Sequence, residues 1–167
     1  AGVPLKQLPI SSLAALGGNA LTDDIDVRNT LEDDGLPNTF VPGRNLFFLT
    51  LAAAYAYQID AANLVGGMCE TDYSGYPDCR QGFVDSAAKT INLAMEAQLQ
   101  IHTPLMYLDK AQTWQLAEEL GCLEVVVKDS HTCYNNDREH FQAWGYGCGE
   151  CPACLLRKKG YESAFSS

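Results

Sequence analysis

Four cysteines in the last third of the chain constrain the fold more than any other feature. Cys148, Cys151 and Cys154 follow at three-residue intervals in "GCGECPAC", and Cys133 lies upstream, beyond residues 134–147. Four thiolates suit a tetrahedral zinc ion, and the glycines at positions 145, 147 and 149 let the backbone turn tightly around it. The sequence therefore predicts a closed zinc site that draws these segments together. Because a closed site cannot activate water, its predicted role is structural.

Three alternatives for these cysteines stay open at this point. A CxxCxxC run with a remote fourth cysteine also resembles a ferredoxin-type iron–sulfur site, although the Cys-Pro pair expected three residues further on is missing. His140 lies inside the loop and could replace one sulfur. The third alternative is buried thiols that bind nothing.

Composition limits the classes of protein to consider. A chain of 167 residues that is 47% hydrophobic can bury a sizeable single core. Seven cysteines is an odd number and no signal segment is visible, which favours reduced thiols and a cytoplasmic location. The net charge of −10 argues against extended nucleic acid as a partner. The longest apolar run, residues 46–57, is too short to span a membrane.

The order of apolar segments predicts an α/β fold. Residues 1–43 look irregular, and residues 44–60 are apolar nearly all round, as in a helix packed on more than one side. A buried strand is expected at 62–67, a helix from near Arg80, and a strand within 99–105. Asp109 and Gln112 suggest a capping box for a helix that ends at Gly121, and a last helix should follow Pro152. Alternating helices and strands indicate parallel strands joined by crossover helices.

Ligands of such sheets bind beyond the carboxyl ends of the strands, which here means the loops at 66–80 and 103–110. The first loop offers carboxylates that can accept hydrogen bonds from amines and ring NH groups, and tyrosines that can stack on a flat heterocycle. A plain polar surface loop is the alternative. Outside these loops, Lys158 and Lys159 are expected to complement a helix C-terminus, whereas Arg157 is expected to face a ligand. The candidates in the first loop are Glu70, Asp72, Tyr73, Tyr76, Asp78 and Arg80.

Five ordered motifs resemble one family. They are "GLPNTFVPGRN", "CETDYSGYPDCR", "TPLMYLDKAQTW", "TCYN" and "GCGECPACLLR", and they cover roughly residues 36–161. Together they are similar to the 7-cyano-7-deazaguanine synthase family of queuosine biosynthesis. Two of these motifs, "SGYPDCR" and the cysteine knuckle, are specific to that family, whereas each of the others alone would be a weak indication.

The resemblance implies a Rossmann-like parallel sheet with crossover helices, of the adenine nucleotide alpha hydrolase type, and a C-terminal zinc knuckle with a helix. It implies an ATP-dependent carbon–nitrogen ligase that converts 7-carboxy-7-deazaguanine and ammonia into 7-cyano-7-deazaguanine, with zinc as cofactor and ATP and Mg²⁺ as co-substrate. By motif position, the metal ligands are Cys133, Cys148, Cys151 and Cys154. The substrate-binding residues are Glu70, Asp72, Tyr76, Asp78 and Arg80, and the phosphate-binding residues are Arg44, Lys110 and Arg157.

One departure from the family affects the expected activity. The family's Ser-Gly-Gly-x-Asp-Ser loop for ATP does not occur in this chain. We therefore expect the chain to be the C-terminal portion of the synthase, a single partial domain over residues 1–167. In it, 1–43 is mostly irregular, 44–130 is the α/β part and 131–167 is the zinc-binding part. The alternatives are a non-catalytic, zinc-stabilised ligand-binding module and a related ATP-dependent tRNA thiolation protein. A homodimer is compatible with each of them.

Overall fold

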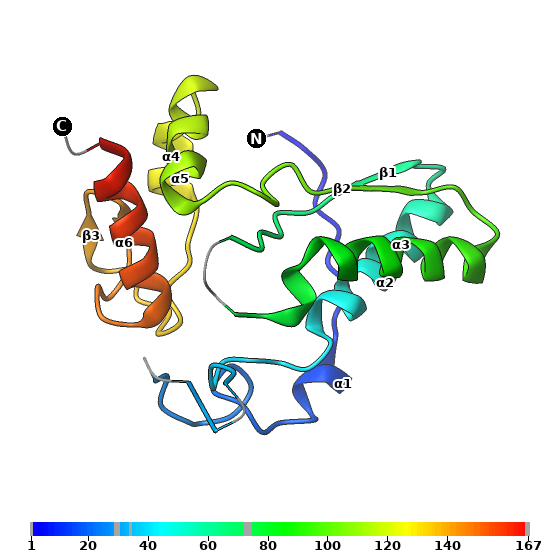
Figure 1. The fold of residues 1–167 in the computed structure, drawn as a ribbon, viewed down its shortest axis with the longest axis horizontal. Helices are drawn as coiled ribbons and strands as arrows, with labels where there is room; N and C mark the ends of the chain where they lie inside the picture. The colour runs from blue at the N-terminus through cyan, green and yellow to red at the C-terminus, as the bar shows by residue number, and fades with distance from the viewer. Residues whose placement is uncertain (1, 29–30, 34, 72–74, 166–167) are drawn as a thin grey trace.

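The computed structural model describes residues 2–28, 31–33, 35–71 and 75–165. Its elements form two groups (Figure 1). One contains helices α2 and α3 with strands β1 and β2, and the other contains helices α4, α5 and α6 with the β3–β4 hairpin. Apart from the short helix α1 (Ser11–Ala14) and an isolated antiparallel bridge between Leu31 and Pro37, the described residues before position 44 form turns and irregular segments.

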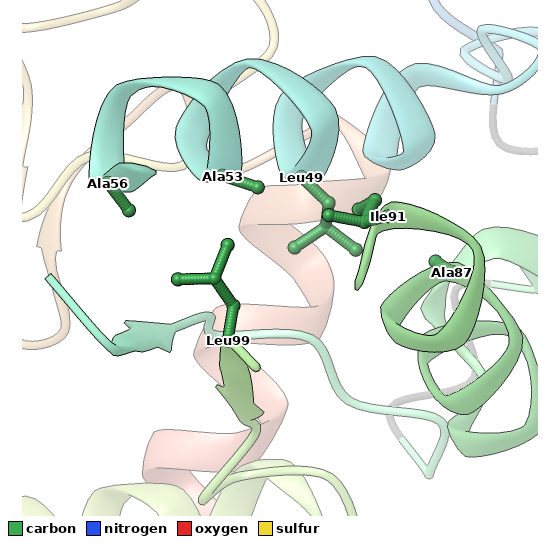
Figure 2. Close-up of a cluster of buried hydrophobic side chains, with 6 residues drawn as sticks. All are labelled: Leu49, Ala53, Ala56, Ala87, Ile91 and Leu99. Carbon is green, nitrogen blue, oxygen red and sulfur yellow. The ribbon is translucent and has the colours of Figure 1, made fainter. Parts of the chain in front are cut away.

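Helix α2 (Arg44–Gln58) follows Gly43, whose φ of 71° is readily adopted by glycine. Leu49, Ala53 and Ala56 form its buried stripe, which shares one core cluster with Ala87 and Ile91 of α3 and with Leu99 (Figure 2). The predicted packing on more than one side is wrong for the described chain, because Leu46, Phe47 and Phe48 are 42%, 42% and 48% exposed. The partner elements that the structure describes cover one face of α2, so its remaining apolar side chains stay at the surface.

Strands β1 (Asn63–Val65) and β2 (Gln100–His102) pair in parallel, with Leu64 opposite Ile101. The 3-10 turn η1 (Pro77–Cys79) and helix α3 (Gln81–Met95) make the crossover between them, so the predicted parallel connection is confirmed. The strands are shorter than predicted. The first is also not fully buried, because Val65 points away from the core and is 75% exposed. The result is a mixed α/β structure with a small parallel sheet.

The second group begins with α4 (Lys110–Glu119), whose predicted capping box is confirmed. The Asp109 carboxylate accepts a hydrogen bond from Gln112 N at 2.8 Å, and the Gln112 side chain accepts one from Asp109 N at 2.9 Å. Helix α5 (Leu123–Asp129) and the hairpin of β3 (Phe141–Gln142) and β4 (Gly145–Tyr146) were not anticipated. Helix α6 (Pro152–Phe165) packs along α4. The division of one domain at positions 43 and 130 stays a prediction.

Candidate metal site and adjoining pocket

The four cysteines converge where the β3–β4 hairpin meets the start of α6. Their sulfur atoms all lie within 4.8 Å of one another, and Cys148 Sγ is 3.9 Å from Cys154 Sγ. Four sulfurs about 2.3 Å from a tetrahedral zinc ion would be about 3.8 Å apart, so the cluster fits such an ion closely. His140 instead bonds to Asp137, with Nδ1 2.7 Å from the carboxylate, and is exposed. The ligand atoms that converge within the described residues are the four cysteine sulfurs, and His140 is not among them, which favours four thiolates over a histidine ligand.

The backbone around the cluster supports thiolates. Cys148 Sγ accepts hydrogen bonds from the backbone N–H groups of Glu150 and Cys151 at 3.5 and 3.4 Å. Burial raises the pKa of Cys133, but hydrogen bonds from the backbone of Cys148 and Asp137 outweigh it and leave that pKa at about 7. Burial raises the pKa of Cys154 well above its usual range. The cluster can therefore hold a metal ion, and binding would displace the Cys154 proton.

Glycine is required at position 147 for a steric reason. A Cβ atom there would lie 2.7 Å from Cys154 Sγ and 3.2 Å from the Trp144 ring. Any larger residue would therefore push the hairpin away from the sulfurs.

A cavity of about 730 Å³ lies between the two groups of elements. The loops that follow the two parallel strands meet beside it. Glu70 N donates to Met106 O at 3.0 Å, and the Thr71 hydroxyl and the Cys69 thiol donate to Leu108 O at 2.7 and 3.0 Å. The two loops therefore come together at the carboxyl ends of the strands, the edge at which such sheets bind ligands.

Three predicted residues line this cavity in a way that suits a ligand. They are Arg44 at the start of α2, Tyr76 in the first loop and Lys110 at the start of α4. The Arg44 guanidinium lies over the Tyr76 ring, 5.2 Å from its centre, so the cation and the ring form one wall.

Arg157 also borders the cavity, but its donors bond to the protein itself. Its Nε donates to Trp144 O at 2.7 Å, Nη1 to Ser130 Oγ at 3.0 Å and Nη2 to Val126 O at 2.9 Å. Its guanidinium lies 5.1 Å from the centre of the Trp114 ring. Burial lowers the pKa of Arg157, and the nearby Cys154 opposes that shift. These contacts favour a structural role, in which Arg157 joins α5, the hairpin and α6.

The predicted carboxylates of the first loop stabilise helix starts. Asp78 is buried, and its Oδ2 accepts a hydrogen bond from Asn45 N at 2.9 Å in the first turn of α2. Glu70 accepts one from Gln81 N at 2.8 Å at the start of α3. Arg80 is exposed at the N-cap of α3. None of these three lines the cavity. Asp72 and Tyr73 lie outside the described residues.

Two aromatic residues outside the predicted set border the cavity. They are Tyr134 and Trp114. Burial raises the pKa of Tyr134, helped by its hydrogen bond to Tyr76. The signal that could have identified Tyr134 is its place directly after the metal-ligand candidate Cys133 in "TCYN".

A small parallel sheet whose loops border a pocket, followed by a cluster of four cysteines, defines a class: a mixed α/β protein with a C-terminal cysteine cluster that could hold a metal ion. The profile of the family described as "Queuosine biosynthesis protein QueC" matches residues 1–165, and the chain belongs to this family. Within the described residues no helix combines the length and apolar character that a membrane crossing requires.

Curated relatives carry a consistent name. A protein of Burkholderia cenocepacia (strain HI2424) named 7-cyano-7-deazaguanine synthase is 53% identical over 159 residues, which cover 93% of this chain and 64% of the relative. A protein of Rhodopseudomonas palustris (strain HaA2) named 7-cyano-7-deazaguanine synthase 1 is 54% identical over 157 residues, which cover 92% of this chain and 65% of the relative. The chain thus spans a little under two thirds of the length of these relatives.

Proposed function

We propose that this chain is the substrate-binding, zinc-stabilised part of an ATP-dependent ligase that makes 7-cyano-7-deazaguanine from 7-carboxy-7-deazaguanine and ammonia. The observation that carries the proposal is the cavity at the carboxyl ends of the parallel strands, lined by Arg44, Tyr76 and Lys110 beside the four-cysteine cluster. Membership of the family and the names of its relatives agree with it. The finer assignment of the sheet to the adenine nucleotide alpha hydrolase type belongs to the same proposal.

The reaction needs activation because a carboxylate is a poor electrophile. ATP converts one carboxylate oxygen into a leaving group, ammonia displaces it to give the amide, and a second activation removes the amide oxygen to leave the nitrile. A protein assists such steps mainly by positioning the reactants and stabilising charge on the phosphates. Arg44 and Lys110 are the cations we assign to the phosphates, and Tyr76 is the ring we assign to the deazaguanine.

The metal in this proposal is structural zinc, held by Cys133, Cys148, Cys151 and Cys154. Four thiolates fill a tetrahedral ion, so zinc would supply stability and no open position for chemistry. A cytoplasmic location is part of the proposal, because it keeps these thiols reduced. Arg157 and Asp78 serve in it as structural residues, and Asp72 and Arg80 keep their proposed substrate role.

The test is product formation. The chain, and in parallel the chain joined to the upstream part of the Burkholderia cenocepacia relative, is incubated with 7-carboxy-7-deazaguanine, ammonium, Mg²⁺ and ATP, and the nitrile is measured by mass spectrometry. We expect the joined protein to form the nitrile and Lys110→Met to reduce its rate at least tenfold. The control Lys159→Met changes an exposed cation on α6 and should leave the rate unchanged.

No nitrile from the joined, zinc-loaded protein would reject the proposal. Binding of the deazaguanine without any consumption of ATP would favour a non-catalytic binding module instead.

A further inference from the structure

Three hydroxyl groups from distant parts of the chain meet at the wall of the cavity. Thr39 Oγ1 lies 2.5 Å from the Tyr76 hydroxyl, which lies 3.2 Å from the Tyr134 hydroxyl. Thr39 is 2% exposed and Tyr76 is buried, while Tyr134 borders the cavity. We call these three residues the hydroxyl cluster. It connects the irregular N-terminal segment, the loop after β1 and the segment that leads into the metal site.

One end of the hydroxyl cluster is fixed by the cysteines. Tyr134 directly follows Cys133, and the turn that contains both is closed by a hydrogen bond from Asn136 N to Cys133 O at 3.1 Å. A metal ion that binds Cys133 Sγ would therefore fix the backbone from which the Tyr134 side chain extends. Without the ion, the Cys133 side chain keeps its hydrogen bonds from the backbone of Cys148 and Asp137 and its apolar packing, but loses the bond that ties it to the other three sulfurs.

The other end of the cluster shapes the ligand-facing wall. The Tyr76 ring stacks on Phe40, with ring centres 6.1 Å apart, and carries the Arg44 guanidinium on its face. A change in the position of the Tyr76 hydroxyl would therefore shift the cation that we assign to a phosphate group. The loops after the two parallel strands also meet beside the cavity, through the contacts at Met106 and Leu108.

We propose that Tyr134 is a positioning residue that couples occupancy of the four-cysteine site to the geometry of the cavity wall at Tyr76 and Arg44. This inference rests on the proposed function for the identity of the ligand, whereas the coupling itself rests on the contacts above. The metal then does more than stabilise the C-terminal part, because it also holds the wall of the pocket in its binding geometry.

Hydrogen–deuterium exchange of the protein without ligand tests the coupling. In the wild type, removal of zinc should speed exchange at residues 38–41 and 76–80. The variant Tyr134→Phe with zinc bound should already show faster exchange there, by about fivefold for the loss of one net hydrogen bond. Its residues 145–155 should stay protected, and removal of zinc should add little at 38–41 and 76–80. The matched control is Tyr107→Phe, at an exposed tyrosine, and should behave as the wild type.

The coupling is overturned if zinc removal has as large an effect at these segments in Tyr134→Phe as in the wild type, or if zinc-loaded Tyr134→Phe exchanges like the wild type. Binding of Co²⁺ in place of zinc, followed by its thiolate absorption bands, verifies that the variant still forms the metal site. If Tyr134→Phe does not form the metal site, Thr39→Val is the variant to use, because it removes a hydroxyl of the hydroxyl cluster far from the cysteines. This variant should speed exchange at 76–80 with the metal bound, and unchanged exchange there would refute the coupling.

A second readout separates this inference from the proposed function. The affinity of zinc-loaded Tyr134→Phe for 7-carboxy-7-deazaguanine should be about fivefold weaker than that of the wild type. If the zinc-loaded wild type does not bind the deazaguanine, the proposed ligand is wrong, while the exchange data still decide whether Tyr134 couples the two sites. Wild-type affinity in the variant, with unaltered exchange, would reject the coupling alone.

Discussion

Replacement of Arg157 by methionine tests whether this arginine holds the C-terminal part together or serves a ligand. The side chain is 7% exposed and donates three hydrogen bonds, to Trp144 O, Ser130 Oγ and Val126 O. Methionine keeps most of the apolar stem, so the substitution mainly removes the guanidinium and leaves two buried carbonyl groups without this donor.

The expected cost follows from these contacts. Each intramolecular hydrogen bond contributes about 1 kcal/mol net, and charged donors contribute more, so three bonds amount to about 3 kcal/mol. The stacking on Trp114 adds a smaller contribution of about 0.5–1 kcal/mol. We therefore expect Arg157→Met to lower the free energy of unfolding of the zinc-loaded protein by about 3–4 kcal/mol.

Urea denaturation at saturating zinc, followed by tryptophan fluorescence, measures this change, because Trp114 and Trp144 both lie beside the arginine. The matched control is Lys158→Met on the same helix. Lys158 is exposed and approaches Glu162 at 3.9 Å, so the control should change stability by less than about 0.5 kcal/mol. A loss below about 1 kcal/mol in Arg157→Met, combined with weaker ligand binding, would refute the structural role and restore the predicted phosphate contact.

Three further predictions concern the metal, the α4–α6 contact and a helix cap. Burial raises the pKa of Cys154, so its proton must leave when zinc binds, and zinc affinity should therefore rise with pH. The calorimetric enthalpy of zinc binding at pH 7.5 should then depend on the ionisation enthalpy of the buffer. An enthalpy of zinc binding that is the same in all buffers would contradict this release of a proton. Gly160→Ala would place Cβ 2.5 Å from Lys110 Cβ and should lower the free energy of unfolding by about 1–3 kcal/mol. The control Gly82→Ala lies in open space on α3 and should raise it by about 0.5–1 kcal/mol. Equal thermal midpoints for the two variants would contradict the close packing of α6 on α4. Asp78→Ala removes the hydrogen bond to Asn45 N at the start of α2 and should lower the free energy of unfolding, measured by urea denaturation, by about 1–2 kcal/mol. An unchanged free energy of unfolding would argue against this role of Asp78.

Local features of this fold were predictable from the sequence. The capping box joins Asp109 to Gln112 within a single helical turn, so its two residues identify it without any knowledge of the rest of the chain. The parallel pairing of β1 and β2 follows from the helix between them. The cysteine spacing likewise indicated convergence, because thiols three residues apart at a helix start can face one ion.

Features that depend on distant partners were not predictable. The sequence shows Asp78 as an available carboxylate, yet its hydrogen bond goes to Asn45, 33 positions earlier. Arg157 is next to two exposed lysines in the sequence, but its partners lie at Ser130, Trp144 and Val126. Exposure of Phe47 and Phe48 depends on which elements cover α2, and periodicity alone does not show it.

Calorimetric titration of 7-carboxy-7-deazaguanine into the zinc-loaded chain, and into the same chain stripped of zinc, shows whether the pocket binds the deazaguanine and whether zinc holds it in its binding geometry. We expect saturable binding at one site in the zinc-loaded protein and at least tenfold weaker binding after zinc removal, with recovery when zinc is added back. Absence of binding by the folded, zinc-loaded chain, or equal affinity with and without zinc, would contradict it.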